Sequence, residues 1–269
     1  MVTASAARLR ADIERLKALR GAASADVPTD RLEFANSLGI APDPWQVELL
    51  RSDSLRFLLN CSRQSGKSTM ASILALHKAL AAPGSLILIL APAERQAKEL
   101  FSKVAAFYRH LGHIIPMDSY RKLGMNLASG SRIEALPGSE KTIRGFSGVD
   151  LLIVDEAARV ADELYYTVRP MLAVSGGRLM MLSTPFGKRG VFYQEWTGDG
   201  AWERYTATAA ECPRIPPEFL EEERKTLGPW WFAQEYEGRF MDTVDQVFQT
   251  DVIDGAITEE VAPLFGGTP

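Results

Sequence analysis

The sequence predicts an α/β fold in which a mostly parallel β-sheet is covered by helices on both faces. Short apolar runs alternate with helical patterns through the middle of the chain, the order expected of parallel strands joined by crossover helices. These runs are apolar throughout rather than at every second residue, as strands buried on both faces are. A composition of 46% hydrophobic and 24% charged residues is ordinary for a globular chain of 269 residues.

Two helices are predicted before the first strand. Residues 6–21 form an amphipathic pattern that ends at Gly21, and a second helix begins near Trp45 in the segment PDPWQVELLRS. The core elements then follow as pairs of strand and helix: 55–60 and 67–80, 85–91 and 93–111, 151–156 and near 162–174, 179–184 and near 188–196. This alternation predicts one continuous core.

The pattern changes twice. Between Lys122 and Leu136, two short strands around Ser129-Gly130 predict a hairpin inserted before the next core strand. After Trp202 the alternation weakens, prolines interrupt the chain, and small helices are predicted over 218–227 and 230–236. We therefore expect three parts: an N-terminal helical arm (1–36), a core (37–210) and a small linker or lid subdomain (211–269).

Composition and charge limit the class of protein. The chain lacks 18 consecutive apolar residues and its N-terminus is too charged for a signal peptide, so we expect an intracellular protein with no membrane partner. Cys61 and Cys212, its two cysteines, do not have metal-ligand spacing. A net charge of −4 is unusual for a free-standing nucleic-acid binder. A ring-shaped motor can be acidic overall and basic in its channel, so charge leaves DNA binding open.

A phosphate-binding loop is predicted between the first core strand and its helix. The segment Cys61–Thr69 reads CSRQSGKST, so that backbone N–H groups and a helix N-terminus can face phosphates, and Lys67 can bridge the β and γ groups of ATP. The hydroxyl of Ser68 is the predicted ligand of Mg²⁺. Cys61 replaces the usual first glycine, and the plain alternative is a strand-to-helix turn with a surface lysine. The motif predicts a P-loop NTPase fold, with these nucleotide-binding residues: Ser62, Arg63, Gln64, Ser65, Gly66, Lys67, Ser68 and Thr69.

An acidic pair ends the strand LLIVDE at the carboxyl edge, where ligands bind in open parallel sheets. Asp155 is the predicted holder of Mg²⁺, and Glu156 is the predicted general base that polarises the attacking water. The alternative is an acidic cap of the following helix. Thr184, at the end of the next strand, is predicted to sense the γ-phosphate together with Ser183, unless this segment is only a turn.

Trp45 and Gln46 are weaker candidates, for contact with the adenine base. A glutamine amide can pair with the donor and acceptor edge of adenine, and an aromatic ring can pack beside the base. A buried tryptophan with a polar neighbour explains these two residues equally well.

As a set, these motifs resemble the ATPase domain of the large terminase subunit of tailed bacteriophages. The resemblance rests on Trp45-Gln46, the phosphate loop, the strand and acidic pair at 151–157, and Ser183-Thr184-Pro185, in this order. Members of that family carry an arginine in the phosphate loop and often lack its first glycine. The segment from Leu227 to Phe240 is similar to the family's linker subdomain.

The resemblance implies a motor that hydrolyses ATP with Mg²⁺ to pump double-stranded DNA into a procapsid in the host cytoplasm. It implies a homo-oligomeric ring, with the portal protein and the small terminase subunit as partners. The family's C-terminal nuclease is expected to be absent, because the sequence ends at Pro269. Four aspartates in the polar tail are then expected to be solvated linker charge: Asp242, Asp245, Asp251 and Asp254.

Two arginines are candidate catalytic residues by the same resemblance. Arg63 is predicted to reach the γ-phosphate within its own subunit, with a bracing role as the alternative. Arg144 matches the family's arginine finger, which acts on a neighbouring subunit, with a surface arginine as the alternative. A helicase-like or remodelling ATPase and a non-hydrolysing nucleotide-binding scaffold are competing functions. Glu156 argues against the scaffold, since a scaffold has no use for a positioned base.

Overall fold

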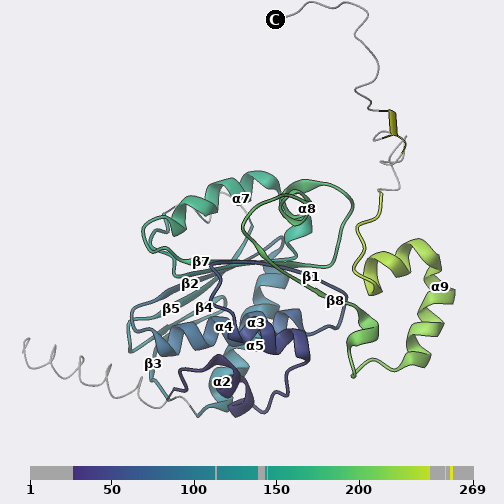
Figure 1. The fold of residues 1–269 in the computed structure, drawn as a ribbon. Coiled ribbons are helices and arrows are strands. Elements are labelled where there is room, and N and C mark those ends of the chain that lie inside the picture. The colour runs from purple at the N-terminus through teal and green to yellow at the C-terminus, as the bar shows by residue number, and fades with distance from the viewer. Residues whose placement is uncertain are drawn as a thin grey trace, which may run out of the picture.

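The computed structural model describes residues 27–112, 114–138, 143, 145–242, 252, 255 and 256. Within them an eight-stranded sheet separates two layers of helices (Figure 1). The helix predicted over 6–21 lies outside the described residues, as do Asp245, Asp251 and Asp254. None of the described helices is both long and apolar enough to cross a membrane.

The sheet has the strand order β3-β4-β5-β2-β6-β7-β1-β8. From β5 to β8 all neighbours are parallel, whereas β3 and β4 join the other edge as antiparallel strands. The strands are β1 (Arg56–Cys61), β2 (Leu86–Ala91), β3 (Met117–Arg121), β4 (Gly124–Leu127), β5 (Arg132–Pro137), β6 (Leu151–Asp155), β7 (Arg178–Ser183) and β8 (Glu203–Ala207).

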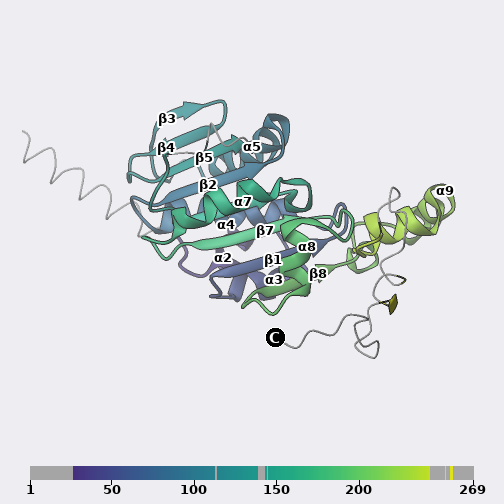
Figure 2. The same cartoon turned by 90° about the horizontal axis from the view of Figure 1, so that it is seen from above.

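Helices cover both faces of this sheet, as predicted (Figure 1). One face carries α2 (Arg31–Ser37), α3 (Pro44–Arg51), α4 (Lys67–Ala81) and α5 (Glu94–His110). The other carries α7 (Asp162–Val168) and α8 (Gly190–Thr197), together with the 3₁₀ turns η1 (Ala157–Arg159) and η2 (Arg169–Leu172). A third turn, η3 (Ala209–Glu211), leads to α9 (Pro217–Tyr236), which lies beyond the edge strand β8 (Figure 2).

Two hydrophobic cores, one on each face, explain why the strands are apolar at every position. Successive side chains of a strand point to opposite faces. Phe57 and Leu59 accordingly pack in the core under α2–α5, while Leu58 packs in the core under α7 and α8. The same alternation holds in β2, where Ile87 and Leu88 enter different cores. Both faces of each central strand are therefore buried.

The predicted hairpin is present, but its place in the fold differs from the expectation. Its second strand, β5, is itself a member of the parallel sheet and pairs with β2 from Leu86 to Ala91. The hairpin is thus not an appendage, since β3 and β4 continue the sheet beyond β5. The sequence pattern did not predict β3, β8 or the short helix α2. β8 alternates because Tyr205 and Ala207 pack in the core under α2–α5, whereas Thr206 between them is exposed.

The two small C-terminal helices are confirmed and meet at Gly228. Gly228 has φ 74° and ψ 169°, a conformation that breaks the helix between its two halves. Pro229 follows, where it begins the second half without needing a hydrogen-bonded N–H.

Candidate functional site

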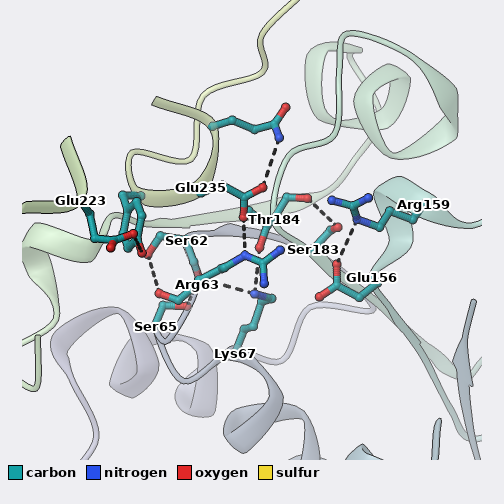
Figure 3. Close-up of polar contacts among 12 residues, drawn as sticks. Ser62, Arg63, Ser65, Lys67, Glu156, Arg159, Ser183, Thr184, Glu223 and Glu235 are labelled. Atoms are coloured by element: carbon teal, nitrogen blue, oxygen red, sulfur yellow. Dashed lines mark hydrogen bonds and ion pairs between the residues drawn. The ribbon is translucent and has the colours of Figure 1, made fainter. Parts of the chain in front are cut away.

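The ends of three neighbouring strands bring the predicted motifs together. β7 lies between β6 and β1, and all three are parallel, so their carboxyl ends meet at one edge of the sheet. In register, Asp155 faces Leu182 and Asn60 faces Ser183. The phosphate loop, the acidic pair and the Ser183-Thr184 pair therefore lie side by side (Figure 3).

The phosphate loop is held by its own polar groups. The hydroxyl of Ser65 donates to the carbonyl of Ser62 at 2.9 Å, and both serines are fully buried. Gln64 and Gly66 have φ of 60° and 91°, in the left-handed region. This conformation turns the chain sharply from β1 into α4, whose first turn contains Lys67, Ser68 and Thr69.

Lys67 is buried among neutral oxygens. Its ammonium lies 3.1 Å from the hydroxyl of Thr184 and 3.4 Å from the carbonyl of Ser62 (Figure 3). Within the described residues, no carboxylate forms an ion pair with it. A buried charge without an opposite charge is costly. The site is therefore suited to an anion. A phosphate group fits there because the oxygens that Lys67 contacts, on Ser62 and Thr184, are neutral.

The acidic pair ends β6, and Glu156, at the N-cap of η1, makes no side-chain capping hydrogen bond. Asp155 is 7% exposed, and burial, followed by the charge of Glu156, raises its pKa to about 6. Its carboxylate accepts the backbone N–H of Glu156 at 3.0 Å. Glu156 has φ 50°, which is uncommon for a residue other than glycine. Its carboxylate lies 3.9 Å from Arg159, at the loose limit of an ion pair.

A bound cation would stabilise the Asp155 carboxylate against the burial that raises its pKa. Within the described part of the chain, no three His, Cys, Asp or Glu side chains form a metal-binding group. A site with so few protein ligands suits Mg²⁺, which usually takes one or two of them and completes its shell with phosphate oxygens and water.

Arg63 pairs with the C-terminal helix in this structure. Its guanidinium forms an ion pair with Glu235, its backbone N–H donates to the Glu235 carbonyl at 3.0 Å, and Gln234 donates to the same carboxylate at 3.2 Å. The hydrogen bond that the Arg63 guanidinium donates to the Glu235 carboxylate raises the pKa of Arg63. This is the bracing arrangement named above as the alternative. Contact of Arg63 with a γ-phosphate remains a prediction.

Gln46 is similarly engaged. Its amide oxygen accepts from the backbone of Asp43 and its amide nitrogen donates to the carbonyl of Ser65, both at 3.0 Å. Trp45 packs against the core on its side of the sheet. These contacts favour the structural alternative, in which Gln46 supports the phosphate loop, and the adenine contact of Trp45 and Gln46 remains a prediction. Arg144 lies outside the described residues.

Three residues that contact the predicted site residues could not be recognised from the sequence pattern. Arg159 contacts Glu156 and stacks on Phe186, with its guanidinium carbon 3.9 Å from the ring centroid. Glu235 reaches Arg63 from 172 residues away. Arg214 makes a two-point ion pair with Asp43, at 2.9 and 2.6 Å, at the start of α3. Each is an ordinary charged residue in its local sequence.

The chain matches known proteins over most of its length. Residues 58–254 match the family described as terminase large subunit, T4likevirus-type, N-terminal. The chain is 27% identical over 257 residues to the terminase large subunit of Thermus phage G20c, covering 82% of this chain and 53% of that protein. It is 28% identical over 225 residues to that of Escherichia phage T5, covering 79% and 51%. It thus spans about half the length of these relatives.

Solved structures of large terminases also resemble this chain. The ATPase domain of the large terminase of Thermus phage P74-26 has a TM-score of 0.69 and 25% identity, covering 78% of this chain and 98% of that one. The HK97 bacteriophage large terminase shares the fold, with a TM-score of 0.62 at 16% identity over 80% of this chain and 54% of that one. The P-loop fold, the converging motifs and the family match together place the chain: it belongs to the T4likevirus-type family of terminase large subunits, whose N-terminal part it matches.

Proposed function

We propose that this chain binds ATP with Mg²⁺, hydrolyses it, and forms the motor part of a large terminase that moves double-stranded DNA into a procapsid. The observation that carries the proposal is the 3.1 Å contact between Lys67 and Thr184. It joins the phosphate loop to the end of β7, the strand between the loop and the acidic pair. One site thus combines a cation for phosphates, a hydroxyl and two carboxylates.

ATP binding is assigned to the phosphate loop. The N-terminus of α4 and the loop N–H groups bind the phosphates, and Lys67 exchanges its neutral partners for the β and γ groups. Ser68 and Asp155 would hold Mg²⁺, which supplies charge neutralisation on the same phosphates when bound. Thr184 then loses one partner, so its hydroxyl is free to respond to the γ-phosphate.

Hydrolysis is assigned to Glu156. Its carboxylate accepts a proton from the water that attacks the γ-phosphorus, while Lys67 and the loop stabilise charge on the phosphoryl oxygens. Arg63 and Arg144 are the two candidate arginines for the transition state, from the same and the neighbouring subunit. The φ of 50° at Glu156 costs conformational energy, and residues with such strained backbones cluster at functional sites.

DNA, the homo-oligomeric ring, the portal protein, the small terminase subunit and the host cytoplasm belong to the proposal through the family. The family match does not favour the helicase-like or remodelling alternative. We also expect no DNA cleavage by this chain. Asp242, the described member of the four tail aspartates, forms an ion pair with Lys188 at 3.1 Å, so it is not the solvated charge that the sequence predicted.

The test compares Glu156→Gln with Lys67→Ala. Two assays are run on each: equilibrium binding of a fluorescent ATP analogue with Mg²⁺, and release of inorganic phosphate with and without double-stranded DNA. Glu156→Gln is expected to bind as the wild type does and to turn over about 10²-fold more slowly or worse, the worth of a general base. Lys67→Ala is expected to lose both binding and turnover, since the phosphates lose their buried cation.

Lys225→Ala, on the exposed surface of α9, is the matched control for removing a lysine and should behave as the wild type. Near-normal hydrolysis by Lys67→Ala would end the assignment of the phosphate loop. Loss of binding by Glu156→Gln would make Glu156 a structural or metal-binding residue. Turnover that does not respond to DNA in the wild type would argue against the motor and leave hydrolysis standing.

A further inference from the structure

A cavity of about 340 Å³ lies at the amino ends of the central strands, opposite the phosphate loop. Leu151 and Arg178, the first residues of β6 and β7, line it, whereas the catalytic groups follow the last residues of these strands. A strand rises about 3.3 Å per residue, so the length of β6 places roughly 15 Å between the two sites. The cavity is therefore separate from the nucleotide site.

The cavity has an apolar wall and a charged rim. Apolar side chains from β1, α4, β6 and β7 form the wall: Phe57, Leu74, Ala81, Ala82, Leu151 and Met180. The polar residues are Thr29, Arg31, Asp53, His77, Lys78 and Arg178. A mostly apolar hollow of at least 300 Å³ with a few convergent polar groups is the usual form of a small-molecule site.

Two arginines of the rim converge on one oxygen atom. Arg31 and Arg178 each direct a guanidinium nitrogen at Oδ1 of Asp53, at 2.8 and 3.1 Å. The arginine side chains are 16% and 26% exposed, whereas that of Asp53 is 89% exposed. Burial, and then the charge of Arg31, lowers the pKa of Arg178. The carboxylate of Asp53 thus marks a position that attracts an anion, although an exposed ion pair holds it only weakly.

The charged groups of the rim have nearby partners of opposite charge. Lys78 lies 3.6 Å from Asp150, which balances it, and burial lowers the pKa of His77, whose Nε2 lies 2.9 Å from the carbonyl of Pro28. Arg31 and Arg178 share the single charge of Asp53, and Arg31 is also attracted by the carboxylate of Asp30. Two guanidiniums therefore lie beside the apolar wall, and the carboxylate that they share is exposed.

We propose that this cavity is a second ligand site, which binds a small molecule that combines an apolar ring or chain with one anionic group. The apolar part lies against Phe57, Leu74 and Met180. The anionic group, a carboxylate, sulfonate or phosphate, replaces Asp53 between Arg31 and Arg178. Both features of the cavity are then used, since the wall desolvates the ring and two half-buried guanidiniums bind the anion.

The test uses 8-anilinonaphthalene-1-sulfonate as the probe, because it joins aromatic rings to one anionic group. Its fluorescence is titrated with the purified chain, and saturable binding at one site is expected. Arg178→Gln should weaken the Kd about tenfold or more, the worth of a charge-assisted hydrogen bond. Asp53→Asn should tighten binding, because it removes the competing carboxylate. Ala81→Leu should weaken binding by filling the cavity.

Two controls test whether the probe binds elsewhere on the surface and whether each variant is folded. Trp231, on α9, is 46% exposed and offers the probe another aromatic surface, so Trp231→Ser should leave the Kd unchanged. Circular dichroism and thermal melting verify that each variant is folded. If Arg178→Gln does not fold, Asp53→Asn and Ala81→Leu decide the question, since their effects have opposite signs.

Competition then tests the two halves of the ligand. Phenyl phosphate and benzoate should displace the probe, and their relative potency tells phosphate from carboxylate as the preferred anion. Inorganic phosphate as potent as phenyl phosphate would overturn the apolar half, and 1-naphthol as potent as the probe would overturn the anionic half. The whole proposal falls if the wild type shows no saturable binding, or if Arg178→Gln and Ala81→Leu both bind as the wild type does.

Discussion

At the scale of single residues, the backbone conformation of the site is unusual. Among the described residues, Gln64 and Glu156 are the non-glycine residues with positive φ, and both follow the end of a strand at the nucleotide edge. Such conformations cost about 1–3 kcal/mol and persist where surrounding contacts hold them. The turn into α4 holds Gln64 in this conformation. The hydrogen bond from the backbone N–H of Glu156 to the Asp155 carboxylate holds Glu156 in it. Both residues thus lie at the end of the sheet where the proposed phosphate site is.

Gly66→Ala is expected to damage the phosphate loop. Gly66 has φ 91°, and an added Cβ would lie 2.6 Å from Nε2 of Gln46. Because Gln46 is buried and both ends of its amide are bonded, the displaced amide loses its bonds to Asp43 and Ser65. We expect a loss of about 1–3 kcal/mol in the free energy of unfolding by urea, and weaker ATP binding.

Gly84→Ala separates steric contact from backbone strain. Gly84 has a similar φ of 80°, but an added Cβ meets nothing within 4 Å. Its variant should lose stability through strain alone and should bind ATP normally. Equal ATP affinity of the two variants would show that Gln46 does not support the loop.

At the scale of elements, α9 is tied to the phosphate loop through its second half. Glu235 contacts Arg63, and the carbonyl of Gly238, just after α9, accepts from the side chain of Asn60 in β1 at 2.8 Å. The first half, from Pro217 to Leu227, is mostly exposed. The two halves meet at Gly228 and are also joined by side chains, since the Tyr236 hydroxyl donates to Glu223 at 2.8 Å and the Arg224 guanidinium lies 4.1 Å from the ring centroid of Phe232.

Gly228→Ala is expected to loosen the first half of α9 selectively. The conformation at Gly228, φ 74° and ψ 169°, is essentially restricted to glycine, while the space around it is open, so the cost comes from the backbone alone. Amide hydrogen exchange should show faster exchange over residues 217–227 and unchanged protection in β1 and β7. Gly39→Ala is the control, at φ 72° with equally open space but between α2 and α3. Unchanged exchange over 217–227 would show that the kink is not needed.

At the scale of the whole molecule, the two proposed sites lie at opposite ends of the central strands. The carboxyl ends of β1, β6 and β7 bear the nucleotide site, and their amino ends border the cavity with the paired arginines. Helix α4 connects the two, because Lys67 begins it and Ala81, on the cavity wall, ends it. Its 15 residues span about 22 Å.

The proposed role of Arg144 leads to a prediction about the assembled protein. If Arg144 completes the site of a neighbouring subunit, turnover per subunit should rise with protein concentration, and Arg144→Ala should keep ATP binding while losing most turnover. An arginine finger is worth about 10³–10⁵ in rate. Mixing Arg144→Ala with Glu156→Gln should restore part of the activity, since some interfaces pair an intact base with an intact finger.

Arg63→Ala mixed with Glu156→Gln distinguishes the two arginines, because every site in that mixture lacks either its own Arg63 or its own Glu156. Because Arg63 lies in the loop of its own subunit, its loss should not be rescued by a neighbour's Arg63. Co-assembly is verified by native mass spectrometry. A mixture of Arg144→Ala and Glu156→Gln that co-assembles and stays inactive, or a turnover per subunit that is flat with concentration in a verified monomer, would argue for Arg63 acting alone.

Local pattern alone determined much of this protein. The apolar runs, the loop around Lys67 and the pair Asp155-Glu156 are each contiguous, so their chemistry and their strand or helix context are encoded in neighbouring residues. The parallel, doubly covered sheet followed from the same runs. The kink near Gly228 followed from local turn chemistry.

Only the tertiary structure decided which segments became neighbours. It placed β7 between β6 and β1, made β5 part of the parallel sheet and added the polar edge strand β8. It also joined Arg63 to Glu235, and Arg31 and Arg178 to Asp53, across long stretches of chain. Such contacts depend on how whole elements pack, and a charged residue that takes part in them has the same local sequence pattern as one that faces solvent.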